Sequence, residues 1–471
     1  MSIPLEPGGL PRRHEMNRET VSMLAELQSN ILKPHVRDHL VAMFFRFETA
    51  EIGKRFLAAV AGLVKSASQH LDEIAAFDTS KGAKVGRPYV GVGLTYAGYR
   101  TLEIEDSRCP ADPVFRRGMT DPQSIDQLCD PNLDTWEAGY QRGLHAVVLI
   151  AAATVTPGMV GVASGVTAVA NLCRAVESNG AGATLIHKEI GTSLQNADGD
   201  SIEHFGYVDG RGQPLFLRED IEAEHFGSTG TSIWDPDIGL GRLIVRDPAA
   251  PNPDVHRGSY LVFRKLEQNV KAFKRQERDL ADRLRMEGED EERAGALIVG
   301  RFEDGTPLAM QSAAGTHHPV PNDFDYRSDP NGLKCPLFAH VRLVNPRDQA
   351  SRKHLMARRG VPYGNRRRDD QPNDGKIRNK PTKGVGLLFM AFNADLAEQF
   401  VFTQAQLANG TSQPMDLLIG QGGRRSPIHC PTEWGSGDQV KVTRPIEQTV
   451  TMKGGEYFFM PSIAFLREFI A

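Results

Sequence analysis

Runs of apolar residues with two different periods divide the first half of the chain into strands and helices. Alternating or continuous apolar runs of about four to eight residues indicate strands, whereas apolar residues that recur every three or four positions indicate helices. The first half therefore reads strand, helix, strand, strand, helix, strand. In order, these predicted elements lie at residues 41–48, 52–69, 87–94 (leading into a helix that starts at Thr95), 145–154, 162–178 and 182–194.

The second half repeats this kind of pattern without repeating the sequence itself. It opens with an apolar strand at residues 259–266, and the charged stretch that follows predicts one long helix over residues 267–292. Its later elements are a buried strand at residues 384–392, a helix at residues 393–407 and a final strand at residues 454–462. Periodicity alone thus supports a mixed α and β protein with two halves.

Composition narrows the class of protein. The chain has 471 residues, of which 40% are hydrophobic and 24% are charged, as is usual for a soluble globular protein of more than one domain. The net charge of -4 argues against a general nucleic-acid binder, and no stretch predicts a membrane partner. The cysteines are odd in number and lack CxxC spacing, which favours free thiols in the cytoplasm. They are Cys109, Cys129, Cys173, Cys335 and Cys430.

One histidine stands out as a candidate metal ligand. His340 lies in the apolar run CPLFAHVRLV, and the cation Arg358 follows it 18 residues later in ARRGVPYG. A neutral imidazole is a common ligand of iron and other transition metals. A histidine between apolar neighbours is also often a hydrogen-bonded core residue. The residue types alone leave both interpretations open.

One carboxylate lies in a glycine-dense stretch upstream. Asp209 occurs in HFGYVDGRGQP, between Gly206 and Gly210. Glycines allow a sharp turn and a close approach of the backbone to a ligand, so the stretch can present one carboxylate at a defined point. A simple Asp-Gly turn fits the same residues equally well.

Taken together, the motifs resemble one family. GYVDG, CPLFAHVRLVNPR and ARRGVPYG occur in that order, as in the dye-decolorizing peroxidases, which are haem enzymes. The resemblance extends over residues 26–462. Other segments that resemble the family are ELQSNILKPH, GVGLTYAGYRTL, RGSYLVFRKLEQNV, GRFEDGTPL, GLLFMAFNADLAEQFVFTQ and GGEYFFMPS.

The resemblance implies an α+β fold with two ferredoxin-like domains, each built on an antiparallel four-stranded sheet, and haem held mainly by the second domain. On this basis, the first domain spans residues 21–226 and the second spans residues 255–471. A Gly-, Pro- and Asp-rich connection, residues 227–254, lies between them. Residues 1–20 are expected to form a partly ordered N-terminal arm.

The resemblance also implies a reaction. The protein is expected to bind haem b, to reduce hydrogen peroxide and to oxidise dyes, phenolics or similar donors through a ferryl intermediate. His340 is the implied iron ligand, Asp209 the distal base and Arg358 the distal cation that stabilises developing charge. Further implied contacts with the cofactor come from Gly206, Gly210, Arg342 and Phe389.

Several points stay open at this stage. Asp395 is either the hydrogen-bond acceptor of His340 or a helix cap, and Arg359 either shares the role of Arg358 or does not. A haem carrier or sensor on the same fold is the alternative function. The oligomeric state is open, and a homo-oligomer is compatible with the sequence. Aromatic residues that are candidate electron relays by residue type alone are Trp136, Trp234, Trp434 and Tyr363.

Overall fold

The structure is a computed structural model of the full chain. Its described residues are 2–35, 37–80, 88–153, 165–179, 182–226, 233–286, 291–315, 320–365, 376–410, 415–421, 427–442 and 446–469. No helix within these ranges is long and apolar enough to cross a membrane.

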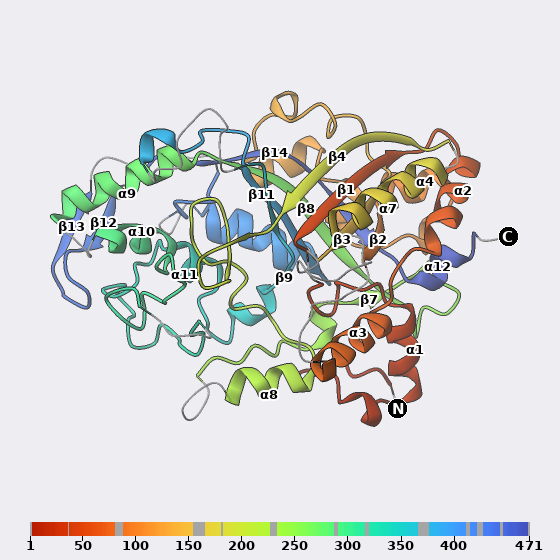
Figure 1. Ribbon diagram of the computed structural model, residues 1–471, viewed down its shortest axis with the longest axis horizontal. Helices are drawn as coiled ribbons and strands as arrows, with labels where there is room; N and C mark the ends of the chain where they lie inside the picture. Colours follow the sequence, from red (N-terminus) through yellow and green to blue (C-terminus); the bar gives the residue numbers. More distant parts are fainter. Residues whose placement is uncertain are drawn as a thin grey trace.

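The N-terminal half forms an antiparallel sheet of four strands in the order β2-β3-β1-β4. Within the described residues, the predicted apolar runs lie in or next to these strands or in the helices beside them, whereas residues 87, 154 and 162–164 of the predicted elements lie outside the described ranges. Helix α7 (Gly165–Asn179) packs against β1 and β3, and α2 (Ala50–Ala61) packs against α7 (Figure 1). The four strands are β1 (His39–Arg46), β2 (Tyr89–Leu94), β3 (Ala146–Ala152) and β4 (Thr184–Thr192).

The C-terminal half forms a second antiparallel sheet, in the order β10-β11-β8-β14. In both halves the first strand lies between the third and the fourth, which is the ferredoxin-like order. The predicted fold class is therefore confirmed, although the two halves share no repeated sequence. These strands are β8 (Arg257–Gln268), β10 (Val361–Tyr363), β11 (Gly386–Asn393) and β14 (Val450–Met460).

The two sheets join at both edges and close into a barrel. β14 pairs with β2 through Phe459 and Leu94, and β4 pairs with β10 through Gly191 and Tyr363. Closure buries apolar residues of both halves in one core; for example, the rings of Phe44 and Phe263 lie 5.0 Å apart. Closure of the barrel pairs backbone N–H and C=O groups of edge strands that could otherwise pair with other chains. The residue limits of the two domains stay a prediction.

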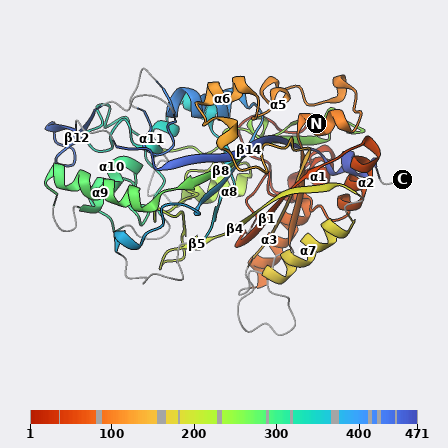
Figure 2. The same cartoon turned by 90° about the horizontal axis from the view of Figure 1, so that it is seen from above.

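A second hydrophobic core lies beside the barrel, in the C-terminal half. It includes residues of α9 (Val270–Leu284), α10 (Glu291–Val299) and the hairpin formed by β12 (Ile428–Pro431) and β13 (Gln439–Val442). Figures 1 and 2 show α9 and α10 at one end of the molecule, with the N-terminal half at the other. Helix α11 (His340–Val344) packs between α10 and the π-helix η8 (Ala397–Ala408).

Two predicted helices differ from the structure. The helix predicted at residues 52–69 is two helices, because α2 ends at Ala61 before Gly62, and α3 (Ala67–Ser80) begins after a turn. The helix predicted at residues 267–292 is wrong at both ends, since β8 continues to Gln268, α9 ends at Leu284 and a separate helix, α10, begins at Glu291; residues 287–290 lie outside the described residues. The side chain of Asn269 then caps α9, and Arg285 ends it in the left-handed region with φ 56°.

The expected N-terminal arm is packed against the rest of the chain. Leu10 is buried and its backbone N–H donates to the carbonyl of Phe216 at 2.7 Å. Helix α1 (Arg18–Glu26) already begins inside the segment assigned to the arm, with Asn17 as its cap. Remaining elements of the described residues are α4 (Tyr96–Thr101), α5 (Pro113–Arg117), α6 (Pro122–Leu128), α8 (Arg218–Phe226), α12 (Ile463–Arg467), β5 (Leu194–Gln195), β6 (Ser201–Ile202), β7 (Val245–Arg246), β9 (Ala357–Arg358), η1 (Arg13–Glu15), η2 (Asp106–Arg108), η3 (Leu133–Thr135), η4 (Leu240–Arg242), η6 (Ser351–His354) and η7 (Ile377–Asn379).

Candidate active site

The candidate iron ligand His340 is the first residue of α11 and lines a cavity in the C-terminal half. Its Nδ1 lies 2.7 Å from Oδ2 of Asp416, a fully buried carboxylate. The other carboxylate oxygen, Oδ1, accepts the backbone N–H groups of Leu418 and Ile419 at 2.8 and 3.1 Å. Asp416 is therefore held on both sides, and it fixes the orientation of the imidazole. This leaves Nε2 of His340 for a metal ion.

The electrostatics of this pair have a clear direction. Burial disfavours the charged imidazole, but the nearby charge of Asp416 and its hydrogen bond outweigh this and raise the pKa of His340. The charges of Arg358 and Asp209 also act on His340, with opposite signs.

Asp395 is not the acceptor of His340. Its Oδ1 accepts the backbone N–H of Glu398 at 2.8 Å, so it caps the helix that follows. The helix-cap alternative was therefore the right one, and Asp416 is the residue that the sequence did not reveal. Asp416 is 76 positions from His340 and lies in no recognisable motif, which is why spacing could not find it.

The GYVDG stretch is a loop on which Asp209 faces the same cavity as His340. Gly206 and Gly210 have φ of 110° and 87°, values that side-chain-bearing residues rarely adopt, so glycine is required at both turns. The Asp209 side chain is exposed, and its Oδ1 accepts the backbone N–H of Gly210 at 2.6 Å. Gly210 lines the cavity, whereas Gly206 shapes the loop without lining it.

Arg358 ends the short strand β9, and Arg359 follows it with its side chain in a different direction. Arg358 lines the cavity, and its Nη2 donates to the carbonyl of Arg211 at 3.0 Å. Arg359 is buried and donates to the carbonyls of Asn30 and Ile31 at 2.7 and 2.8 Å, so it anchors the N-terminal segment. Of these two arginines, Arg358 is therefore the one that can act on a molecule in the cavity.

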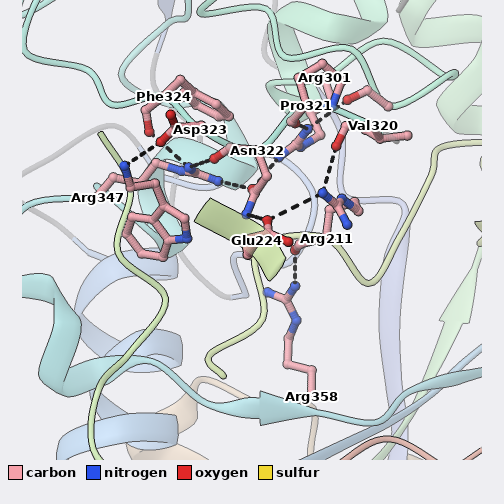
Figure 3. A network of polar contacts seen from close by, with 12 residues as sticks. Arg211, Glu224, Arg301, Val320, Pro321, Asn322, Asp323, Phe324, Arg347 and Arg358 are labelled. Carbon is pink, nitrogen blue, oxygen red and sulfur yellow. Dashed lines mark hydrogen bonds and ion pairs between the residues drawn. The ribbon is translucent and has the colours of Figure 1, made fainter. Parts of the chain in front are cut away.

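Figure 3 shows the polar network that surrounds Arg358. Arg211 donates to the carbonyl of Val320 at 2.7 Å and lies 3.5 Å from Glu224 on α8. Glu224 also accepts the side-chain N–H of Asn322 at 3.0 Å. Arg211, whose carbonyl accepts from Arg358, is thus itself held in place through its guanidinium.

Asn322 is the centre of this network. Its Oδ1 accepts from Arg347 at 2.6 Å and from Arg301 at 3.2 Å, and both arginines line the cavity (Figure 3). Burial lowers the pKa of Arg301 to about 9 and that of Arg347 to about 10, so both guanidinium groups stay charged at neutral pH. One wall of the cavity is therefore cationic.

The rest of the cavity fits an apolar ring that carries anionic groups. Aliphatic and aromatic side chains such as Val341, Leu387 and Phe389 line it. Arg264, also in the wall, is 2% exposed; its Nη2 pairs with the buried Asp130, whereas its Nε and Nη1 have no hydrogen-bond partner among the described residues. Unpaired buried donors of this kind are costly unless an acceptor binds there. The residues present therefore fit haem: His340 would bind its iron, and the arginines would bind its carboxylates.

Arg342 lies outside the described cavity wall. Its guanidinium donates to Asp329 Oδ2 at 2.9 Å and to the carbonyl of Cys335 at 2.6 Å. It therefore fixes the loop before α11 and does not face a ligand. Its prediction as a cofactor contact has no support in the geometry.

The aromatic candidates for electron relay lie outside the cavity wall as well. Among the described residues that line the cavity, the tyrosine is Tyr207. It is not one of the four candidates chosen by residue type. It neighbours Asp209 in the GYVDG motif, so its closeness to the site could have been noticed. The four residues that do not line the cavity are Trp136, Trp234, Trp434 and Tyr363.

Comparison with known proteins agrees with the geometry. A family model described as the DyP dimeric alpha+beta barrel domain matches residues 26–163, and one described as Dyp-type peroxidase, C-terminal, matches residues 242–421. The multifunctional dye peroxidase DyP2 of Amycolatopsis sp. (strain ATCC 39116 / 75iv2) is 52% identical over 466 residues, which cover 95% of this chain and 96% of that protein.

Solved structures give the same result. The structure of DyP2 from Amycolatopsis sp. ATCC 39116 matches with a TM-score of 0.90 and 49% identity, over 99% of this chain and 100% of that chain. The DyP-type peroxidase of Anabaena sp. matches with a TM-score of 0.84 and 36% identity, over 95% of each chain. The predicted family and enzyme class are thus confirmed. This chain belongs to the dye-decolorizing peroxidase family and is a haem-dependent, peroxide-consuming oxidoreductase.

Proposed function

We propose that this protein holds haem b in the cavity beside α11, with Nε2 of His340 as the iron ligand, and uses Asp209 and Arg358 to act on hydrogen peroxide. The observation that carries the proposal is one cavity lined by all three side chains, with Asp416 bound to the far nitrogen of His340. Arg264, Arg301 and Arg347 would hold the anionic groups of the cofactor.

When bound, the haem supplies the redox chemistry by which peroxide is reduced with two electrons and organic donors are oxidised to replace them. Asp416 keeps Nδ1 of His340 in a hydrogen bond to a negative charge. This makes the imidazole a stronger donor to a metal and prevents it from turning. The chain thus determines the electronic character of the site from the proximal side.

Asp209 would act as the proton acceptor. A carboxylate in the cavity can take a proton from one peroxide oxygen and return it to the other, so that the second leaves as water. Arg358 stays cationic during this transfer and stabilises the negative charge that develops as the O–O bond breaks. Its fixed hydrogen bond to the carbonyl of Arg211 keeps the guanidinium in place.

The proposed partners are hydrogen peroxide and an organic reducing substrate, such as a dye or a phenolic compound. The N-terminal family model is described as a dimeric barrel domain, which is compatible with a homo-oligomer. The five cysteines are all unpaired, which supports a cytoplasmic location. The alternative of a haem carrier or sensor has no such support, because the curated relatives DyP2 and msp1, which match 95% and 94% of this chain, are named peroxidases.

The test is to reconstitute the purified chain with haem b and to follow its absorption and its oxidation of a dye with peroxide. We expect a Soret band and peroxide-dependent bleaching of the dye. The variant His340→Ala should lose or loosen the cofactor, while a matched exchange at the helix cap Asp395, Asp395→Asn, should retain it. A stable Soret band without peroxide-dependent oxidation would support the carrier.

A further inference from the structure

We propose that a groove on α9 is a docking site for bulky aromatic substrates that carry several negative charges, such as sulfonated dyes. The inference rests on the proposed peroxidase function, since the docked molecule is a reducing substrate. The groove is separate from the haem cavity, and the described residues that line the two have no member in common.

The groove runs between α9 and η7 (Ile377–Asn379). Arg275 and Arg278 are three residues apart on α9, so their side chains lie side by side, and both are exposed. Arg283 and Arg378 add two more guanidinium groups to the rim. The rim therefore presents four cations on one short stretch of surface.

The balance of charge in the groove is positive, in contrast to the net charge of -4 for the chain. The acids that line it are Asp279 and Glu447, and Asp279 lies 3.7 Å from Arg283. Arg275 and Arg278 form no side-chain hydrogen bond or ion pair within the described part of the chain, so their guanidinium groups can bind a ligand there. A planar guanidinium binds sulfonate or carboxylate oxygens through two parallel hydrogen bonds, so the rim suits an anion with several such groups.

The floor of the groove is apolar. Leu280, Val442 and Ile446 lie in it and are each less than a tenth exposed. An aliphatic floor under a cationic rim is suited to a flat aromatic body with charged substituents, because each part of the ligand meets its preferred surroundings. A small neutral phenol lacks the charges that the rim would recognise.

Helix α9 also reaches the haem cavity, through Phe273, which lies two turns from the groove residue Leu280 on the same side of the helix. Phe273 is buried, and its ring lies 4.1 Å from the ring of Phe205 and 6.1 Å from that of Tyr207. Phe205 and Tyr207 both line the cavity. The groove and the cavity are thus linked through α9 and the rings of Phe273, Phe205 and Tyr207, across which electrons can pass without the substrate entering. Each docked molecule gives up one electron, so two molecules and two protons convert one peroxide to two waters.

The experiment compares the holoenzyme with the double variant Arg275→Gln/Arg278→Gln. The control is Arg18→Gln/Arg55→Gln, which removes the same number of charges from exposed positions on α1 and α2, at the other end of the molecule (Figures 1 and 2). Equilibrium dialysis measures binding of a disulfonated azo dye, and steady-state kinetics measure its oxidation beside that of 2-methoxyphenol. We expect the groove variant to weaken dye binding and raise KM for the dye by about five- to tenfold.

Kinetics with 2-methoxyphenol should be unchanged in both variants, and the dye should bind the control as it binds the original protein. Equal loss of dye binding in the control would show a general effect of net charge and would overturn the groove. Unchanged dye affinity in the groove variant would overturn it too. Failure of the unaltered protein to oxidise 2-methoxyphenol would instead count against the proposed function, and dialysis would still report on the groove.

Discussion

Nδ1 of His340 and Oδ2 of the buried Asp416 lie 2.7 Å apart. Among the described residues, no other side chain binds this oxygen. We expect Asp416→Asn to keep the fold and remove the negative charge behind the imidazole. Loss of such a partner costs about 10- to 100-fold in metal affinity or activity. The measurement is the haem dissociation rate together with the reduction potential of the bound iron, which should rise. An unchanged potential would show that Asp416 only shapes the loop.

Asp209 should control the reaction with peroxide and not the binding of haem. We expect Asp209→Asn to lower kcat/KM for hydrogen peroxide by about 10²- to 10⁴-fold, since general-base catalysis contributes this much. The Soret band should be retained, because the side chain is exposed on its loop. Stopped-flow mixing with peroxide checks the rate. Full activity in the variant would remove Asp209 from the mechanism.

Two adjacent arginines allow a matched comparison. Arg358→Met should impair the peroxide reaction with little effect on stability, since Arg358 is partly exposed and its guanidinium makes one described hydrogen bond. Arg359→Met should instead leave buried carbonyls of Asn30 and Ile31 without donors. Each buried unsatisfied group costs about 1–3 kcal/mol in the free energy of unfolding. Denaturant unfolding and peroxide kinetics on both variants separate the roles, and identical profiles would contradict the assignment.

Asn322 should matter for haem affinity although it does not line the cavity. Asn322→Leu removes the acceptor that holds Arg301 and Arg347 and the donor to Glu224 (Figure 3). We expect weaker haem binding in a titration of the apoprotein and a lower free energy of unfolding by about 1–3 kcal/mol. Glu224→Gln is the milder control, since its amide oxygen can still accept from Asn322. Equal haem affinity in Asn322→Leu would show that the arginines are held by their backbone contacts alone.

Glu456 should make stability depend on pH. Its Oε1 accepts the backbone N–H groups of Met119 and Tyr457 at 2.7 and 2.9 Å, and burial raises the pKa of this carboxyl from 4.5 to about 7. The folded state therefore holds a proton that the unfolded state releases between these two pH values. The free energy of unfolding is highest below the unfolded pKa and decreases as the pH rises through 7, by roughly 3 kcal/mol in all.

The variant Glu456→Gln retains the acceptor oxygen and has no proton to lose. We expect its free energy of unfolding to change less between pH 5 and pH 8 than that of the original protein, as measured by urea unfolding at both values. The difference between the two proteins isolates Glu456 from other groups that titrate, such as Asp247, whose pKa burial raises to about 6. The same pH dependence in both proteins would refute the assignment.

The sequence alone determined the main strands and the family. Apolar runs of strand length lie in β1, β3, β8, β11 and β14, because a strand covered on both faces needs apolar side chains along its whole length. The motifs around Asp209, His340 and Arg358 were recognisable because each is a local stretch of chain. Their shared cavity follows from the structure.

Only the tertiary structure decided the contacts between distant segments. Closure of the barrel depends on β14 meeting β2 and on β4 meeting β10, which no local period encodes. The choice of Asp416 over Asp395 depends on how the chain returns to α11 after η8. Whether Arg358 or Arg359 faces the cavity depends on the direction of each side chain where β9 ends. Such contacts arise from the path of the whole chain, whereas hydrophobic periodicity reports only on the local environment of each residue.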